Sequence, residues 1–144
     1  MDVKNKRVIV TGAASGIGKA LCEAFHQAEA KSVIAVDINL DGAQETADSV
    51  DGIAVQANVG NEKDIINLIE KADEHVGGID IFCSNAGIGG VPGFFEVEAS
   101  DWQNIWDVNV QSHIFAAKHV LPQMIERGEG YLVNTSSAAG LLTQ

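Results

Sequence analysis

The sequence predicts an α/β fold in which helices cover both faces of a doubly wound parallel sheet. Short runs rich in Val and Ile alternate along the chain with segments whose apolar residues recur at the spacing of one helix face. Strands that alternate with helices join through right-handed crossovers, and they therefore form parallel sheets. The turn after the first strand is rich in glycine. We expect the strand order 3-2-1-4-5, with a ligand crevice where that order reverses.

The composition favours one globular domain that spans residues 1–144. Of the 144 residues, 46% are hydrophobic and 20% are charged, which is ordinary for a globular protein. The net charge of −11 argues against nucleic acids and anionic membranes as partners. The residues before the first strand are polar, and the next apolar run is too short to span a bilayer, so we expect a cytoplasmic protein.

Cysteine and histidine do not form a recognisable metal motif. Cys22 falls in a helical pattern and Cys83 ends a strand pattern, so both thiols are expected in the core of a protein from a reducing compartment. The four histidines have no zinc-site spacing and are interpreted as surface or packing residues. We therefore expect no metal site.

The amino-terminal half contains three predicted strands and two predicted helices. Its first strand, from Arg7 to Thr11, has the continuous apolar character of a strand buried on both faces. After Gly16, apolar residues recur with a helical period as far as Ala28. The expected strands cover residues 7–11, 32–37 and 53–57, and the expected helices cover residues 16–28 and 40–50.

The carboxyl-terminal half continues the alternation with longer helices. Asn61 is expected to cap one helix, and Ser100 to cap a long helix that Pro122 bends in its last turns. A glycine-rich loop is expected over residues 87–99. The remaining strands are expected at residues 79–83 and 131–135, and the long helix is expected to end near Arg127.

The turn that follows the first strand reads Thr-Gly-Ala-Ala-Ser-Gly-Ile-Gly over residues 11–18. Such a turn lets the backbone approach a diphosphate, and it directs the free amides and positive end of a helix at the negative charge. Gly12 permits the tight turn, Gly16 the close approach of a ligand, and Gly18 the packing of helix on strand. A merely flexible turn is the alternative, but the strand–turn–helix context favours a dinucleotide site. The expected diphosphate-binding residues are Gly12, Ser15, Gly16, Ile17 and Gly18.

Four short motifs occur in order along the chain. The glycine turn has the spacing Gly-x3-Gly-x-Gly after Thr11; the other motifs are Ser84-Asn-Ala-Gly87, Val108-Asn-Val110 and Asn134-Thr-Ser-Ser-Ala-Ala-Gly140. Together they resemble the motifs of the classical short-chain dehydrogenase/reductase family, except that Ser84 stands where that family usually has Asn. The resemblance implies a Rossmann-type fold whose later strands are missing from this chain. It also implies hydride transfer between an alcohol and a ketone or aldehyde.

Asp37 is the candidate residue for the selectivity between NAD and NADP. It ends the second predicted strand, where a carboxylate can accept hydrogen bonds from both hydroxyls of an adenosine ribose and repels a 2′-phosphate. Neither Ala14 nor Ile38 supplies the positive charge that favours a 2′-phosphate. NAD is therefore expected rather than NADP, and a surface Asp without a ligand is the alternative.

The resemblance adds further cofactor contacts. It implies that Asn58, where the family usually has Asp, accepts a hydrogen bond from the adenine amino group, since an amide oxygen can accept the same bond. It implies that Val59 offers its backbone N–H to the adenine ring. It also places Asn85, Ala86 and Gly87 among the cofactor-binding residues.

Two polar residues are candidates for the chemistry. Asn109 lies within the apolar stripe of the long helix, which includes Trp102 and Trp106, and a buried amide without partners costs about 1–3 kcal/mol. It is either a structural bridge between helix and strand or, from the resemblance, the anchor of a water in a proton relay, and both roles can hold together. The resemblance implies that Ser137 positions the reacting oxygen of the substrate. The side chain of its neighbour Ser136 would point the other way in a regular strand.

The family's acid/base pair, a Tyr followed four residues later by a Lys, does not occur in the sequence. Tyr131 is the single tyrosine, and position 135 is Thr. We expect the pair a little past Gln144, so the chain is interpreted as the amino-terminal part of an NAD-dependent oxidoreductase and as inactive by itself. The alternatives are a non-catalytic dinucleotide-binding or regulatory module and, among enzymes, a nucleotide-sugar epimerase.

The expected partners are a small alcohol or carbonyl substrate and further copies of the chain. Val91, Phe94 and Phe95 could line an apolar substrate pocket. The apolar run from Trp102 to Met124 exceeds what one sheet face needs, so we expect a homo-oligomer in the full-length form.

Overall fold

A computed structural model describes residues 2–89, 93 and 95–141 of the chain. Five strands form one parallel sheet: β1 (Arg7–Thr11), β2 (Ser32–Asp37), β3 (Ile53–Gln56), β4 (Ile81–Ser84) and β5 (Tyr131–Asn134). The α-helices are α1 (Gly16–Gln27), α2 (Leu40–Ser49), α3 (Glu62–Val76), α4 (Ala99–Trp106) and α5 (Ser112–Arg127). A π-helical turn, Asp107–Gln111, joins α4 to α5, and a 3₁₀ turn, Ala138–Gly140, follows β5.

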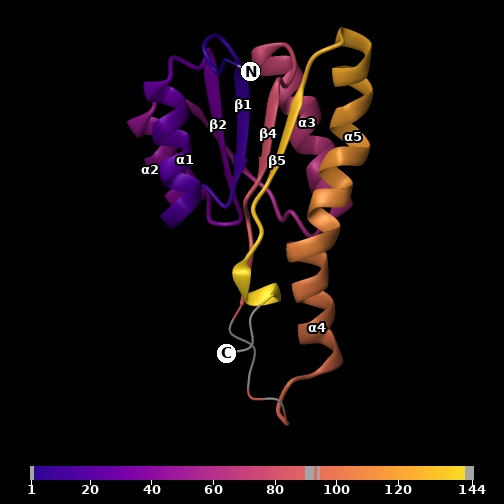
Figure 1. Cartoon of the computed structure of the whole chain (residues 1–144). Helices are drawn as coiled ribbons and strands as arrows, with labels where there is room; N and C mark the ends of the chain where they lie inside the picture. Colours follow the sequence, from indigo (N-terminus) through magenta and orange to yellow (C-terminus); the bar gives the residue numbers. More distant parts are fainter. Residues whose placement is uncertain (1, 90–92, 94, 142–144) are drawn as a thin grey trace.

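The strand order is β3-β2-β1-β4-β5, which confirms the predicted order. Each neighbouring pair is parallel, so all carboxyl ends lie at one edge of the sheet. Helices α1 and α2 cover one face, α3 and α5 cover the other, and α4 extends past the carboxyl ends of the strands (Figure 1). The chain order reverses between β1 and β4, and a crevice at that reversal is where open α/β sheets bind ligands.

Two apolar cores lie on opposite faces of the sheet because successive strand residues point to opposite faces. On β1, Ile9 faces the core shared with α3 and α5, whereas Val8 and Val10 face the core shared with α1 and α2. All three side chains are fully buried. Within the described residues, no helix is both long and apolar enough to cross a membrane.

The long helix differs from the prediction in three ways. It begins at Ala99 rather than after Ser100, because Glu98 and Asp101 form the capping box. The π-helical turn interrupts it and inserts one residue, which rotates the following positions by about 100°. Trp102 and Trp106, predicted on the buried stripe, are 57% and 52% exposed, because α4 extends past the sheet edge. Beyond the π turn, the buried face of α5 consists of Ser112, Ala116, Val120 and Met124.

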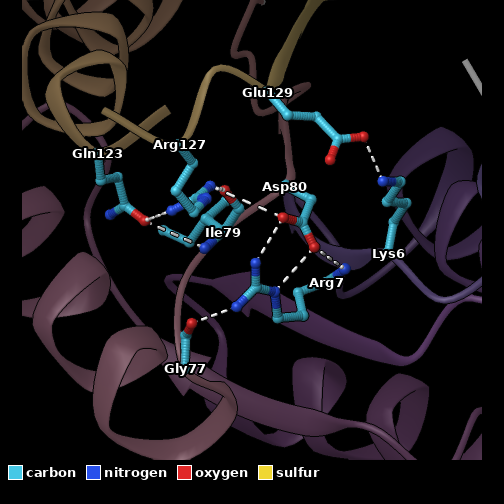
Figure 2. Close-up of polar contacts among 8 residues, drawn as sticks. All are labelled: Lys6, Arg7, Gly77, Ile79, Asp80, Gln123, Arg127 and Glu129. Atoms are coloured by element: carbon cyan, nitrogen blue, oxygen red, sulfur yellow. Dashed lines mark hydrogen bonds and ion pairs between the residues drawn. The ribbon is translucent and has the colours of Figure 1, made fainter. Parts of the chain in front are cut away.

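A buried ion pair joins the amino ends of β1 and β4, at the opposite edge from the crevice (Figure 2). Asp80 is 6% exposed and accepts hydrogen bonds from Arg7 Nε at 2.8 Å, Arg7 Nη2 at 2.6 Å and the Arg7 backbone N–H at 2.9 Å. Arg127, at the end of α5, lies 3.7 Å from the same carboxylate, and Lys6 pairs with Glu129 beside it. Hydrogen bonds from Arg7 hold the pKa of Asp80 down at about 2.

Candidate functional site

The glycine turn has the backbone geometry of a ligand-binding loop. Gly12 and Gly16 have φ values of 70° and 53°, in the left-handed region that favours glycine. A Cβ at Gly18 would lie 2.0 Å from the carbonyl oxygen of Gly12, so only glycine allows the helix to pack on the turn. A Cβ at Gly16 would meet no atom within 4 Å, so the backbone there is open on its outer side. The geometry thus fits the tight turn predicted at Gly12 and the close packing predicted at Gly18, while the approach of a ligand at Gly16 stays a prediction.

The amino end of α1 has features that favour the binding of a negative charge. The helix begins at Gly16, and the side chain of Ser15 caps none of its first amides. No acidic residue lies in the first turn, which therefore keeps the positive end of the helix dipole uncompensated. Gly16 and Ile17 are exposed, and the first N–H groups of a helix have no intrahelical partner, so an anion placed here would find donors at these two residues.

Asp37 is held at the end of β2 by two backbone hydrogen bonds. Its Oδ2 accepts from the N–H of Ala14 at 2.9 Å, and its Oδ1 accepts from the N–H of Asn39 at 3.0 Å. A carboxylate offers about four lone-pair positions, so each oxygen can still accept a hydrogen bond from a ligand. The carboxylate is therefore oriented before any ligand binds.

A cleft of about 220 Å³ lies beside Asp37, between the ends of β1, β2 and β3. Asn58 and Val59, for which adenine contacts are predicted, both line it. The Oδ1 of Asn58 accepts a hydrogen bond from Gly60 N–H at 3.0 Å and keeps a second lone pair. The described lining residues are Gly12, Asp37, Ile38, Ala57, Asn58, Val59, Ala86, Gly87, Ile88, Asn104 and Val108.

A second cleft, of about 760 Å³, lies at the ends of β4 and β5. It shares Ala86, Gly87 and Ile88 with the first cleft, so the loop after β4 borders both clefts near the point where the strand order reverses. Asn109 and Ser137 both line this second part. The structure thus brings the predicted catalytic residues together on the far side of the loop that contains Asn85, Ala86 and Gly87.

The loop after β4 is fastened to the ends of β1 and β5 by threonine hydroxyls. Thr11 Oγ1 accepts from the N–H groups of Asn85 at 2.9 Å and Ala86 at 3.1 Å, and it donates to the carbonyl of Cys83 at 3.2 Å. The Asn85 side chain donates to the Thr11 carbonyl at 3.1 Å and accepts from Thr135 Oγ1 at 3.0 Å. Asn85 is therefore held by protein groups on both sides, which fixes the wall between the two clefts.

Asn109 lies in the π-helical turn and holds the same loop from the other side. Its amide oxygen accepts from the N–H of Ile88, and its amide nitrogen donates to the carbonyl of Ile88, both at 2.8 Å. A π-bulge reorients a side chain that a regular helix would direct elsewhere, and such bulges are frequent at functional sites. The predicted bridge is present, although it joins the helix to a loop rather than to a strand.

The sequence did not predict the part that several residues take in this site. Thr135 and the backbone of Ile88 have no local signal, because their roles depend on contacts with distant segments. His113, interpreted as a packing residue, lines the second cleft. Phe95 is 97% exposed, while Val91 and Phe94 lie outside the described residues.

The two cysteines are core residues, as predicted. Cys22 and Cys83 are both buried and free of disulfides. Burial raises the pKa of each thiol to about 12, so neither is a thiolate near neutral pH.

Known proteins resemble this chain along most of its length. The family model for short chain dehydrogenases matches residues 6–144. Glucose 1-dehydrogenase 2 of Bacillus subtilis (strain 168) is 34% identical over 143 residues, and an uncharacterized oxidoreductase of Staphylococcus aureus (strain MRSA252) is 33% identical over 139 residues. Each alignment covers 94% of this chain, but only 55% and 60%, respectively, of the relative.

The fold also matches a solved structure. A crystal structure from Sinorhizobium meliloti 1021, whose assignment as a short-chain alcohol dehydrogenase is provisional, superposes with a TM-score of 0.91 at 27% sequence identity. The match covers 99% of this chain and 58% of that one. The chain therefore spans a little over half the length of the proteins that it matches.

Proposed function

Because the chain belongs to the short-chain dehydrogenase family, we propose that it is the dinucleotide-binding part of an oxidoreductase that uses NAD. The observation that carries this proposal is the pair of clefts on either side of the loop after β4, one lined by Asp37 and the other by Ser137. A dinucleotide is an elongated molecule with a charged centre, and Gly12, at the start of the turn that leads into α1, lines the first cleft. When bound, the nicotinamide would accept or supply the hydride.

The residues of the first cleft fit the adenosine half of such a cofactor. In this proposal the diphosphate lies against the turn from Gly12 to Gly18, where the open side of Gly16 admits it. The ribose hydroxyls donate to Asp37, and the adenine lies against Asn58 and Val59. Asn85, Ala86 and Gly87 then lie between the two halves of the cofactor, because they separate the two clefts.

Asp37 supports NAD rather than NADP. Its carboxylate would face a 2′-phosphate at close range, and two negative charges at such a distance repel each other. No Lys or Arg occurs among the described residues that line the first cleft. A 2′-phosphate would therefore meet a negative charge with no nearby cation to offset it.

The residues of the second cleft support a positioning role in catalysis. We propose that Ser137 hydrogen-bonds the reacting oxygen of an alcohol or carbonyl substrate, and that Asn109 holds the loop that shapes the site. Neither a serine hydroxyl nor an amide readily exchanges a proton with an alcohol near neutral pH, and the sequence contains no Tyr-x3-Lys pair. General acid–base catalysis contributes about 10²–10⁴-fold, so we expect no useful turnover from these 144 residues alone. Robust turnover with NAD on a panel of secondary alcohols would contradict this expectation.

We also propose an oligomeric state and a cellular location for the full-length protein. Trp102, Trp106, Ile114 and Ile125 expose apolar surface on α4 and α5, which favours a homo-oligomer. Sedimentation of the full-length protein as a monomer would count against it. Its location in the cytoplasm remains a prediction from the sequence.

Binding titrations with NADH and with NADPH, monitored by nicotinamide fluorescence, test which cofactor the protein prefers. We expect NADH to bind at least about tenfold more tightly, equivalent to about 1.4 kcal/mol, and Asp37→Ala to narrow that difference. Asp48→Ala is the matched control, because Asp48 is an exposed carboxylate on the neighbouring helix that does not line the cleft. Equal affinity of the unmodified protein for the two cofactors would refute the assignment of NAD.

A further inference from the structure

Helix α2 contacts the glycine turn directly, and the sequence motifs assign no role to this contact. Thr46, in the middle of α2, is fully buried, and its Oγ1 donates a hydrogen bond to the carbonyl oxygen of Ala13 at 2.8 Å. Ala13 is also fully buried, and its N–H donates to the carbonyl of Val36 at 3.0 Å. Both backbone groups of Ala13 are therefore fixed from outside the turn.

A second contact comes from the first turn of the same helix. A Cβ at Gly42 would lie 2.7 Å from the Cβ of Ala14, which is closer than two non-bonded carbon atoms approach each other. Asn39 caps α2 by accepting from the N–H of Gly42 at 3.3 Å, so the backbone at this point is anchored. Glycine at position 42 thus lets α2 lie close against Ala14.

The peptide between Ala13 and Ala14 links these contacts to Asp37. Its carbonyl oxygen receives the Thr46 hydroxyl, and its N–H, which belongs to Ala14, donates to Asp37 Oδ2 at 2.9 Å. A peptide group is planar, so the direction of the carbonyl determines the direction of the N–H. Rotation of this peptide would turn the donor away from the carboxylate.

We propose that Thr46 and Gly42 are positioning residues that set the cofactor selectivity of the site through the Ala13–Ala14 peptide. The inference rests on the proposed function, because it assigns a use to the orientation of Asp37. With valine at position 46, the Ala13 carbonyl loses this hydrogen bond in a buried environment, and such a group is costly to leave without a partner. The peptide then relieves that cost by rotating, and the Asp37 carboxylate keeps only its hydrogen bond from the Asn39 N–H, so its orientation toward the ribose is held less firmly.

The test compares three variants for NADH and NADPH binding. Thr46→Val keeps the side-chain shape and removes the hydroxyl, whereas Thr46→Ser keeps the hydroxyl. Ser49→Ala is the control on the same helix, because the Ser49 hydroxyl donates to the Thr46 carbonyl and not to the glycine turn. We expect Thr46→Val to reduce the NADH preference by at least about threefold, while Thr46→Ser and Ser49→Ala stay close to the unmodified protein. A loss of overall stability alone would not change the ratio of the two affinities.

Substitution of Gly42 tests the same peptide from the helix side. Gly42→Ala is expected to displace Ala14 and to reduce the NADH preference, as Thr46→Val does. The double variant Gly42→Ala/Ala14→Gly lacks the Ala14 Cβ that causes the clash, so it is expected to recover the preference. Without any ligand, Thr46→Val and Gly42→Ala are both expected to speed hydrogen exchange at the Ala14 amide. If Thr46→Val does not fold, the Gly42 variants decide the question.

The outcomes separate this inference from the proposed function. Failure of the unmodified protein to bind either dinucleotide would overturn the proposed function and this inference together. Binding with an NADH preference that Thr46→Val and Gly42→Ala leave unchanged would overturn this inference alone. A loss of the preference in Thr46→Ser as complete as in Thr46→Val would also overturn it, because the serine hydroxyl can still donate to the Ala13 carbonyl.

Discussion

Replacement of Asp80 with Asn would test how the two central strands are joined at the edge opposite the cleft. Asp80 is buried, receives three hydrogen bonds from Arg7 and lies near Arg127 (Figure 2). Asparagine keeps the size and shape of the side chain, but it removes the negative charge. It also replaces one acceptor oxygen with an NH2 donor, so the substitution separates the charge and its hydrogen bonds from the packing.

The magnitude follows from the pKa of Asp80. Its value falls from 3.8 to about 2 in the folded protein, chiefly because Arg7 donates hydrogen bonds to the charged form. Each pKa unit corresponds to about 1.4 kcal/mol, so the ionised carboxylate contributes about 2 kcal/mol to the free energy of unfolding. Because the folded-state pKa is the lower one, this contribution is fully present above about pH 4 and is lost as the pH falls toward 2.

Urea unfolding followed by circular dichroism, at several pH values between 7 and 2.5, measures this contribution. We expect Asp80→Asn to be destabilised by about 2–4 kcal/mol at pH 7, because Arg7 loses its ionic partner in a largely buried site. The difference from the unmodified protein should shrink by about 2 kcal/mol across the acid range. All other carboxylates are common to both proteins, so their titration cancels in that difference.

Asp48→Asn is the control, since it makes the same chemical change on an exposed part of α2. We expect it to shift stability by less than about 0.5 kcal/mol at every pH. A difference between Asp80→Asn and the unmodified protein that stays constant from pH 7 to pH 2.5 would refute the reasoning. It would mean that the effect of the substitution comes from packing and not from the ionised carboxylate.

Two further substitutions test the loops around the cleft. Gly18→Ala would place a Cβ 2.0 Å from the Gly12 carbonyl, and we expect a loss of about 1–3 kcal/mol in thermal unfolding together with weaker dinucleotide binding. Gly89→Ala, whose Cβ would meet no atom of the described residues within 4 Å, should change neither property, and the same loss at both positions would contradict the role given to Gly18. Asn109→Leu removes both hydrogen bonds to Ile88, which are exposed, so we expect a loss of about 0.5–1.5 kcal/mol and faster hydrogen exchange at the Ile88 amide. Unchanged exchange there would show that the loop after β4 does not depend on Asn109.

The sequence by itself determined the architecture and pointed to much of the candidate site. Apolar runs that alternate with helical periods predicted all five strands, most directly β1, β2 and β4, whose burial on both faces leaves a trace in composition. The strand order followed from the fold class that this alternation indicates. The roles of Gly12, Gly16 and Gly18 were also predictable. A positive φ or a close backbone approach requires glycine wherever it occurs, so the requirement is visible at the residue itself. Asp37 followed from its place at a strand end.

The tertiary structure alone decided which distant groups meet. The π-helical turn that directs Asn109 to Ile88 has no sequence period of its own, and it rotates the buried face of the helix that follows. Thr46 lies on a weakly patterned helix, and only the packing of that helix against the glycine turn brings its hydroxyl to Ala13. The pairing of Arg7 with Asp80 depends likewise on the register of β1 against β4. Contacts of this kind join residues far apart in the chain, and they exist only after the sheet has formed, so no local pattern records them.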